Sequence, residues 1–362
     1  MKTEVFPRLR ECLAKLDIYL VIAMLLLLIY GVVVIWSTSP SLAQKQIIFI
    51  LLGLPLFFLL SYLDYKIFSR IAPYLMLVTF ILLVVTPLFG SEVRGTGRWF
   101  QIGSLTFQPS EVAKLALILG ISWIYSLPNF SELKKFCLSL AVAGLYAVLV
   151  VMQPDLGTAI IILFIWFLVS FLSGAHLIYF FVLFLVSLIS LPVLWQILAT
   201  YQKERIFSFL NPQADPLGGG YNVLQAIIAV GSGKILGRGL GRGPQSQLRF
   251  LPERTTDFIF ASLAEEWGIV GAGVLLAFFF LLLVRVLKTG NRAEDKFGTL
   301  ICAGVFAGIF IQVLINVGMN IGIMPVTGIP LPLISAGGSS LLVTIIFLGL
   351  VHSIYTHHPD HL

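Results

Sequence analysis

Residues 18–36 read IYLVIAMLLLLIYGVVVIW, a continuous apolar run that indicates a membrane protein. It contains no charged side chain, and its length matches the roughly 20 apolar residues that an α-helix needs to cross a bilayer core. Lys2, Arg8, Arg10 and Lys15 precede it, as basic residues precede a signal peptide core. The run is longer than such a core, and no clear small-residue cleavage site follows it. We therefore expect a retained first transmembrane helix.

Composition extends this interpretation to the whole chain. Of the 362 residues, 58% are hydrophobic and 11% are charged, whereas a soluble domain carries about 25% charged residues. So few charges cannot cover the surface of a soluble protein of this size. Cys12, Cys137 and Cys302 have no spacing typical of a metal site or a disulfide framework. We predict an all-α polytopic membrane protein for which lipid is the main solvent.

Further apolar runs predict about ten transmembrane helices within a single domain, residues 1–362. Between the seventh and eighth lies a long charged segment, about 199–266, with an expected helix at 222–230. Loops of this length are uncommon unless they are functional. Its GSGKILGRGLGRG stretch at 231–243 misses the phosphate-loop and dinucleotide spacings, so we interpret it as a flexible basic turn. The expected spans are 18–36, 46–63, 72–89, 109–127, 136–152, 156–173, 176–198, 267–287, 297–319 and 330–355.

The distribution of basic residues predicts the orientation. An even number of helices puts both termini on one side, and the positive-inside rule assigns the cytoplasm to the side with more Lys and Arg in its short connections. The short outer connections and helix ends hold only Lys45, Arg94, Arg98 and Lys114. The formal charge of +6 then reflects membrane topology and contact with lipids, not a nucleic acid partner. The cytoplasmic connections hold Lys2, Arg8, Arg10, Lys15, Lys66, Arg70, Lys134, Lys135, Arg285, Lys288, Arg292 and Lys296.

The fourth predicted helix opens with QPSEVAK at 108–114, which places charges inside the membrane. Pro109 suits a first helical turn, and Glu111 and Lys114, three residues apart, share one face. Intramembrane charges are costly and usually line a cavity or pair with one another. A structural ion pair and a polar cavity open to the outside are both compatible with this pattern.

Arg98 and Asp155 lie in two expected outer connections. Arg98 precedes Trp99, and a guanidinium beside an aromatic ring at the interface could bind a phosphate or simply anchor the chain. Asp155 precedes the sixth predicted helix and is expected to cap it.

Three carboxylates follow one another where the long segment meets the eighth predicted helix. Asp257, Glu265 and Glu266 lie within ten residues at the expected outer face of the membrane. One of them could be a general base whose pKa is raised by partial burial. Alternatively, Asp257 caps the helix and the other two are solvated.

Together these stretches resemble the SEDS family (shape, elongation, division and sporulation proteins) along nearly the whole chain. QSQL at 245–248, Arg254 and GIP at 328–330 favour the rod-shape branch over the division branch. Thr255 stands where many relatives have histidine, which weakens any role for a histidine beside Asp257. The ordered motifs that carry the resemblance are RW at 98–99, FQPSE at 107–111 with Lys114, QPDLGT at 153–158, LPE at 251–253, TDFIF at 256–260, EE at 265–266, PLP at 330–332 and GGS at 337–339.

The resemblance implies a peptidoglycan glycosyltransferase that polymerises lipid II during cell elongation and rod-shape maintenance. It would act at the outer face of the bacterial cytoplasmic (inner) membrane, with a class B penicillin-binding protein as partner. A lipid II flippase and a non-catalytic scaffold for that partner are the alternatives. Gly304 and Gly308, four residues apart, leave a groove either for a partner helix or for packing within the chain.

The resemblance also implies residue roles in an inverting transfer. Asp257 would be the general base, and Glu111 would hold Lys114 in place. No cofactor and no cluster of metal ligands is identified, although a divalent metal could assist the departing pyrophosphate. The expected pyrophosphate-binding residues are Lys114, Glu111, Arg98, Arg254 and Glu253, and the secondary candidates are Glu265, Glu266, Asp155 and Ser110.

Overall fold

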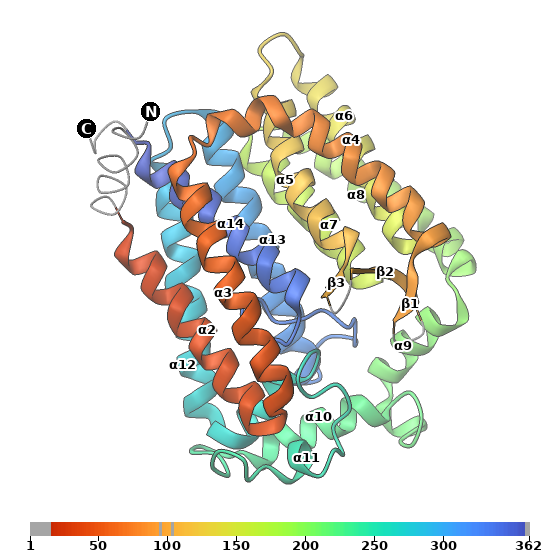
Figure 1. Ribbon diagram of the computed structural model, residues 1–362. Coiled ribbons are helices and arrows are strands. Elements are labelled where there is room, and N and C mark those ends of the chain that lie inside the picture. Colours follow the sequence, from red (N-terminus) through yellow and green to blue (C-terminus); the bar gives the residue numbers. More distant parts are fainter. Residues whose placement is uncertain (1–15, 94–95, 103–104, 359–362) are drawn as a thin grey trace.

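The computed structural model describes residues 16–93, 96–102 and 105–358, and it is built almost entirely of helices (Figure 1). The predictions made for Lys2, Arg8, Arg10, Cys12, Lys15 and Arg94 lie outside the described residues. The long helices are α2 (Ile18–Thr38), α3 (Pro40–Tyr62), α4 (Lys66–Phe89), α5 (Pro109–Ser126), α6 (Glu132–Val151), α7 (Leu156–Leu172), α8 (Leu177–Ile197), α12 (Ile259–Asn291), α13 (Lys296–Asn320) and α14 (Gly338–Thr356).

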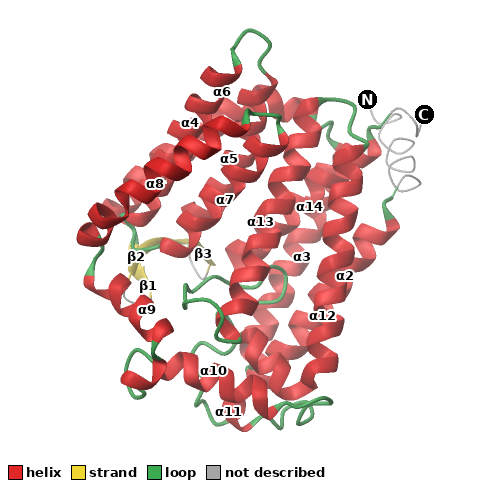
Figure 2. Ribbon diagram, turned by 180° about the vertical axis from the view of Figure 1, so that it is seen from behind, coloured by secondary structure: helices red, strands yellow, loops and turns green. Residues whose placement is uncertain are grey.

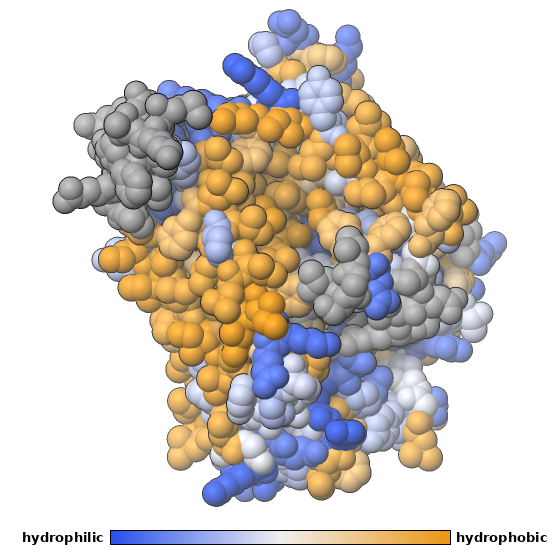
Figure 3. All heavy atoms as spheres, in the orientation of Figure 1, coloured by the Kyte–Doolittle hydropathy of each residue, from blue (hydrophilic) through white to orange (hydrophobic). Residues whose placement is uncertain are grey.

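Each predicted span corresponds to one of these helices, and the all-α class is confirmed. Within the described residues, seven helices are long and apolar enough to cross a membrane, and α5, α7 and α8 fall outside that set. The number of crossings therefore stays a prediction. A broad apolar band covers the middle of the face shown in Figure 3, with polar side chains gathered at its two ends. This distribution is that of a multi-pass membrane protein.

Three local features differ from the predicted helices. A small antiparallel sheet of β1 (Ser91–Val93), β2 (Thr96–Ile102) and β3 (Leu105–Phe107) precedes α5. α12 begins at Ile259, ahead of the expected residue 267, and has a kink at Gly268, where φ is +67°. The last helix begins at Gly338, later than expected, and Leu333 after the PLP motif has a φ of +64°, which a right-handed helix cannot contain.

Hydrogen bonds identify which connections share an end of the bundle. At one end, called the Asp17 end, Arg285 Nη2 lies 2.8 Å from Asp17 Oδ2, and the Asp17 N–H donates to His352 Nε2 over 3.1 Å. This joins the start of α2 to the last turns of α12 and α14. At the other end, called the Asp257 end, Ser37 Oγ donates to Glu266 Oε2 over 2.8 Å, so the end of α2 meets the start of α12. The sheet and α10 lie toward this second end (Figures 1 and 2).

α13 forms the centre of the core, packed against α12, α7 and α5. A Cβ on Gly304 would lie 2.7 Å from Ile118 of α5, and one on Gly308 would lie 3.5 Å from Ile165 of α7. The groove at these glycines is therefore filled from within the chain. This supports internal packing and contradicts its interpretation as a partner contact.

The long segment between α8 and α12 is folded. It contains α9 (Thr200–Leu210), η1 (Pro212–Ala214), α10 (Tyr221–Ser232) and α11 (Pro244–Gln247), and α10 confirms the helix expected at 222–230. The basic turn is not free, because the N–H of Arg238 donates to the carbonyl of Glu265 over 2.9 Å and the N–H of Ile269 donates to the carbonyl of Lys234 over 2.9 Å. These bonds replace helical ones beside Gly268, which explains the kink in α12.

Candidate functional site

The pair of charges on α5 is buried in the centre of the protein. Lys114 is 1% exposed and Glu111 4%, and Lys114 Nζ lies 2.9 Å from each carboxylate oxygen of Glu111. Lys114 Nζ also donates to Gln312 Oε1 of α13 over 3.4 Å. Ser110 Oγ, in the same first turn, is buried without a hydrogen-bond partner in the described part of the chain. A buried charge is costly unless an opposite charge accompanies it, and Glu111 supplies that partner to Lys114.

A row of amides on α13 connects this pair to the turn that carries Asp257. Gln312, Asn316 and Asn320 are spaced four residues apart, so they share one face of the helix. Asn316 Nδ2 donates to the carbonyl of Asp257 over 2.9 Å, and Asn320 Nδ2 donates to the same carbonyl over 3.1 Å. The amide row therefore runs from Lys114 to Asp257 along one helix, each four-residue step covering about 6 Å.

Asp257 lies in the turn before α12 and faces the loop between α13 and α14. Its partial exposure contrasts with the burial of Thr256 and Phe258 on either side. Phe258, not Asp257, occupies the N-cap position of α12, and its side chain makes no cap bond. A Cβ on Gly328 would lie 3.4 Å from Asp257 Oδ2, and Gly328 has a φ of +75°. The loop therefore approaches the carboxylate with the backbone of Gly328 and places no side chain against it at this point.

The turn itself is held from two sides. Ser335 Oγ donates to the carbonyl of Thr256 over 2.6 Å, and the N–H of Ala336 donates to the carbonyl of Thr255 over 2.8 Å. On the other side, Leu251 and Phe258 pack with Ala226 of α10 in a small apolar cluster. Contacts on both sides therefore fix the backbone of the turn that carries Asp257.

Arg98 and Asp155 meet at the N-terminus of α7. Arg98 Nη1 lies 3.3 Å from Asp155 Oδ2, and Gln108 Nε2 donates to the same oxygen over 3.1 Å. Asp155 Oδ1 accepts the N–H of Thr158 over 3.0 Å, which confirms the predicted cap. Because Gln108 directly precedes α5, this cluster lies beside the Glu111–Lys114 pair.

Glu265 and Glu266 accept hydrogen bonds from α11 and from the end of α2. Glu265 accepts the N–H groups of Gln245 over 2.9 Å and of Ser246 over 3.0 Å, as well as the Ser246 hydroxyl. These donors form the N-terminus of α11, a natural carboxylate site. Glu266 accepts from Ser37 and from Gln247 Nε2. Both are buried, so the solvated interpretation of these two residues is wrong.

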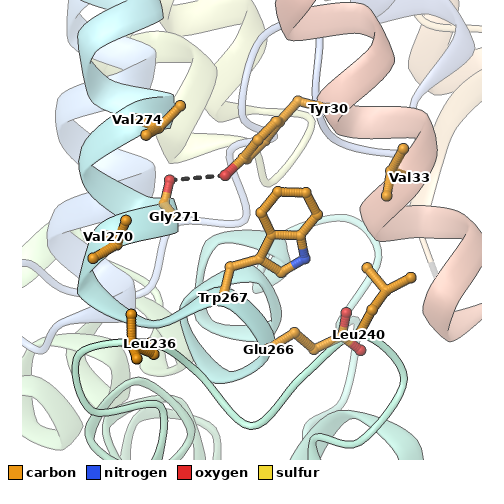
Figure 4. A pocket seen from close by; sticks show the side chains of 9 residues that line it. All are labelled: Tyr30, Val33, Leu236, Leu240, Glu266, Trp267, Val270, Gly271 and Val274. Carbon is orange, nitrogen blue, oxygen red and sulfur yellow. Dashed lines mark hydrogen bonds between the residues drawn. The ribbon is translucent and has the colours of Figure 1, made fainter.

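A pocket of about 570 Å³ lies between α2 and α12 on the Glu266 side (Figure 4). Tyr30, Trp267 and Leu240 line it, and the Tyr30 hydroxyl donates to the carbonyl of Gly271 over 3.0 Å. Glu266 is the one predicted site residue in its lining. The pocket is therefore separate from the cluster around Asp257 and Lys114.

Arg254 points away from Asp257, although the two are close in sequence. Its Nη2 donates to the carbonyl of Thr38 at the end of α2 over 3.2 Å, and its buried Nε has no hydrogen-bond partner among the described residues. Burial lowers the pKa of Arg254, and the nearby charge of Arg249 lowers it further. Glu253 accepts from the Thr256 hydroxyl over 2.8 Å and thereby stiffens the turn.

The structure thus links Asp257 to Lys114 and Glu111 through α13, with Arg98 and Asp155 nearby. Arg254 and Glu266 instead contact the end of α2, and Glu265 contacts α11. The sequence-based prediction missed the amides of α13, whose signal was three of them at four-residue spacing in an otherwise apolar helix. Across residues 16–93, 96–102 and 105–358, no group of three or more His, Cys, Asp or Glu side chains gathers as metal ligands would. The cluster offers a carboxylate that can accept a proton, beside cations that can stabilise an anion.

Known proteins match this chain along nearly its whole length. The family model described as "Cell cycle protein" (FtsW/RodA/SpoVE) matches residues 16–359. The peptidoglycan glycosyltransferase MrdB of Escherichia coli (strain K12) is 40% identical over 347 residues, which cover 94% of each chain. The peptidoglycan glycosyltransferase RodA of Treponema pallidum (strain Nichols) is 32% identical over 420 residues, covering 93% of this chain and 97% of that protein.

Solved structures give the same result. A chain from a structure described as the structural coordination of polymerization and crosslinking by a peptidoglycan synthase complex superposes with a TM-score of 0.82 at 33% identity, covering 93% of this chain and 96% of that chain. The rod shape determining protein RodA of Thermus thermophilus has a TM-score of 0.72 at 30% identity, covering 94% of this chain and 96% of that chain. This chain belongs to the FtsW/RodA/SpoVE family, the SEDS proteins that its motifs resemble.

Proposed function

We propose that this chain is a peptidoglycan glycosyltransferase that polymerises lipid II into glycan strands during cell elongation. The names of its relatives support the activity, and the amide row of α13 carries the assignment to this site, because it joins the buried Lys114 to the turn that holds Asp257. We assign the whole of residues 1–362 to one domain of this activity.

In the proposed step, the 4-hydroxyl of a GlcNAc on the acceptor attacks the MurNAc anomeric carbon of a growing strand. The new C–O bond forms as the anomeric C–O bond to the pyrophosphate breaks, with inversion at the carbon. Asp257 takes the hydroxyl proton as general base. Lys114, positioned by Glu111 and Gln312, offsets the charge that builds on the departing polyprenyl pyrophosphate.

The other predicted residues act around this step. Arg98, oriented by Asp155, lies beside the same site and adds positive charge for the pyrophosphate. Arg254 and Glu253 fix the turn that carries Asp257 rather than contacting the substrate. Glu265 and Glu266 hold the long segment against α12.

The location and the partner follow from the same assignment. We place the protein in the bacterial cytoplasmic membrane, with both termini in the cytoplasm and the Asp257 end outside, where lipid II displays its sugars. A class B penicillin-binding protein would cross-link the strands, in keeping with the synthase complex among the structural relatives.

Purified protein in detergent with lipid II as the only substrate tests the proposal. We expect glycan polymer that appears as a ladder on a gel, and a denatured sample as control should produce none. A protein that moves lipid II between the leaflets of a vesicle but yields no polymer would instead be a flippase. A protein that does neither, but activates its penicillin-binding partner, would be a scaffold.

A further inference from the structure

The cations predicted from the sequence are already engaged within the protein. Lys114 is paired with Glu111 at 2.9 Å, and Arg98 is paired with Asp155 at 3.3 Å. Arg254 is directed at the end of α2. A departing pyrophosphate concentrates negative charge, and it is stabilised best by a cation that no internal carboxylate has already neutralised.

Arg205 of α9 is such a cation. It is partly buried, its Nη1 donates to the carbonyl of Thr327 over 3.4 Å, and its guanidinium lies 5.8 Å from the centre of the Tyr201 ring. Among the ion pairs of the described residues, none includes Arg205. A guanidinium has five N–H donors in a fork that fits phosphate oxygens, and this one uses a single donor on the protein.

The contact with Thr327 places Arg205 next to the proposed base. Thr327 directly precedes Gly328, the residue whose backbone faces Asp257 Oδ2. Two distances set the separation: that from Arg205 to the carbonyl of Thr327, and that from Gly328 to the Asp257 carboxylate. With standard bond lengths, they keep the Arg205 guanidinium and the Asp257 carboxylate within about 11 Å of each other. A sugar and the pyrophosphate bound to its anomeric carbon are long enough to bridge such a distance, so one bound donor can reach both residues.

We propose that Arg205 is a binding residue for the pyrophosphate of the glycosyl donor. The inference rests on the proposed function, and it adds to the site a residue supplied by the long segment between α8 and α12. The carbonyl of Thr327 holds the guanidinium in place, and the remaining N–H groups bind the phosphate oxygens.

The competing explanation is that Arg205 only fastens α9 to the loop. Arg205→Gln separates the two roles, because glutamine keeps an N–H donor for a carbonyl but carries no charge. Arg205→Lys keeps the charge without the fork. Lys203→Gln is the matched control: it removes a charge from the same helix, at a residue that lies 5.9 Å over the Trp195 ring and not at the loop.

Steady-state polymerisation of lipid II and its inhibition by inorganic pyrophosphate, at a fixed excess of free Mg²⁺, provide the measurement. We expect Arg205→Gln to raise both the KM for lipid II and the inhibition constant of pyrophosphate by about 10–100-fold, the usual effect of losing a charged hydrogen bond. Arg205→Lys should recover part of this loss, and Lys203→Gln should behave as the wild type. Unchanged constants in Arg205→Gln would overturn the inference, as would equal losses in Lys203→Gln. Absence of polymer from the wild-type protein would instead contradict the proposed function.

Discussion

Asn316 Nδ2 donates to the carbonyl of Asp257 over 2.9 Å and to the carbonyl of Ile329 over 2.8 Å. One side chain on α13 thus fixes the turn that carries Asp257 against the loop that carries Gly328. Both N–H groups of the amide are used, so the position of Asp257 relative to the loop depends on this residue.

Asn316→Ala should therefore reduce the polymerisation rate more than it reduces stability. The change removes both bonds from Nδ2, which should lower the free energy of unfolding by about 1–3 kcal/mol and reduce kcat with little change in KM. Thermal melting and initial rates measure the two effects. Thr344→Ala, a buried substitution whose hydroxyl bonds only within its own helix, is the control. An activity loss no larger than that of the control would assign Asn316 to packing alone.

Exchange of the charges on α5 tests whether Lys114 acts on the substrate. Glu111→Lys or Lys114→Glu alone puts two like charges in the core and should destabilise the protein by several kcal/mol, in the range of about 3–5 kcal/mol. The double variant restores an ion pair, and Gln312 can turn its amide to donate to the new carboxylate. We expect the double variant to be folded and inactive, because a carboxylate then faces the pyrophosphate. Recovery of polymerisation would make the pair purely structural.

Glu265 should matter for stability rather than for chemistry. In Glu265→Gln, an amide N–H₂ must face the N–H groups of α11, whereas in Glu266→Gln the Ser37 hydroxyl and the Gln247 amide can reorient. We expect Glu265→Gln to lower the melting temperature more than Glu266→Gln, a cost of about 1–3 kcal/mol. A normal melting temperature combined with complete loss of polymerisation would instead identify Glu265 as a catalytic group.

The orientation in the membrane is tested by thiol labelling. In a variant without native cysteines, a cysteine replacing Gln213, an exposed residue of η1, should react with an impermeant reagent in intact spheroplasts. A cysteine replacing Lys134, exposed at the start of α6, should react only after lysis. The reverse pattern would invert the topology.

Local patterns predicted the helices well and the kinked and folded connections less well. Apolar runs specify helices in lipid, so each expected span has its counterpart. The β1–β3 sheet and the kink at Gly268 depend on pairing between distant backbone groups, such as Ile269 with Lys234, which no local pattern reveals. The same reason separates Asp257 from Arg254: they are neighbours in sequence, but the turn directs one at Gly328 and the other at Thr38.

The sequence predicted the charged residues of the candidate site but not the amide side chains that connect them. Glu111 and Lys114 stood out because charge is rare in an apolar helix, and Asp155 because it precedes one. The amides of α13 carry no charge, and their importance appears only when Lys114 and Asp257 are found at the two ends of the row. In the sequence, Arg205 is one of several basic residues in the long segment. Only its contact with Thr327 in the structure places it beside the site.

Polymerisation of lipid II by Asp257→Asn tests whether Asp257 is the general base. Asparagine keeps the shape of the side chain and the backbone carbonyl that Asn316 and Asn320 hold, so the melting temperature should stay near that of the wild type. Loss of the base should reduce the rate by about 10²–10⁴-fold while lipid II still binds. Polymerisation by Asp257→Asn at close to the wild-type rate would show that Asp257 is not the base.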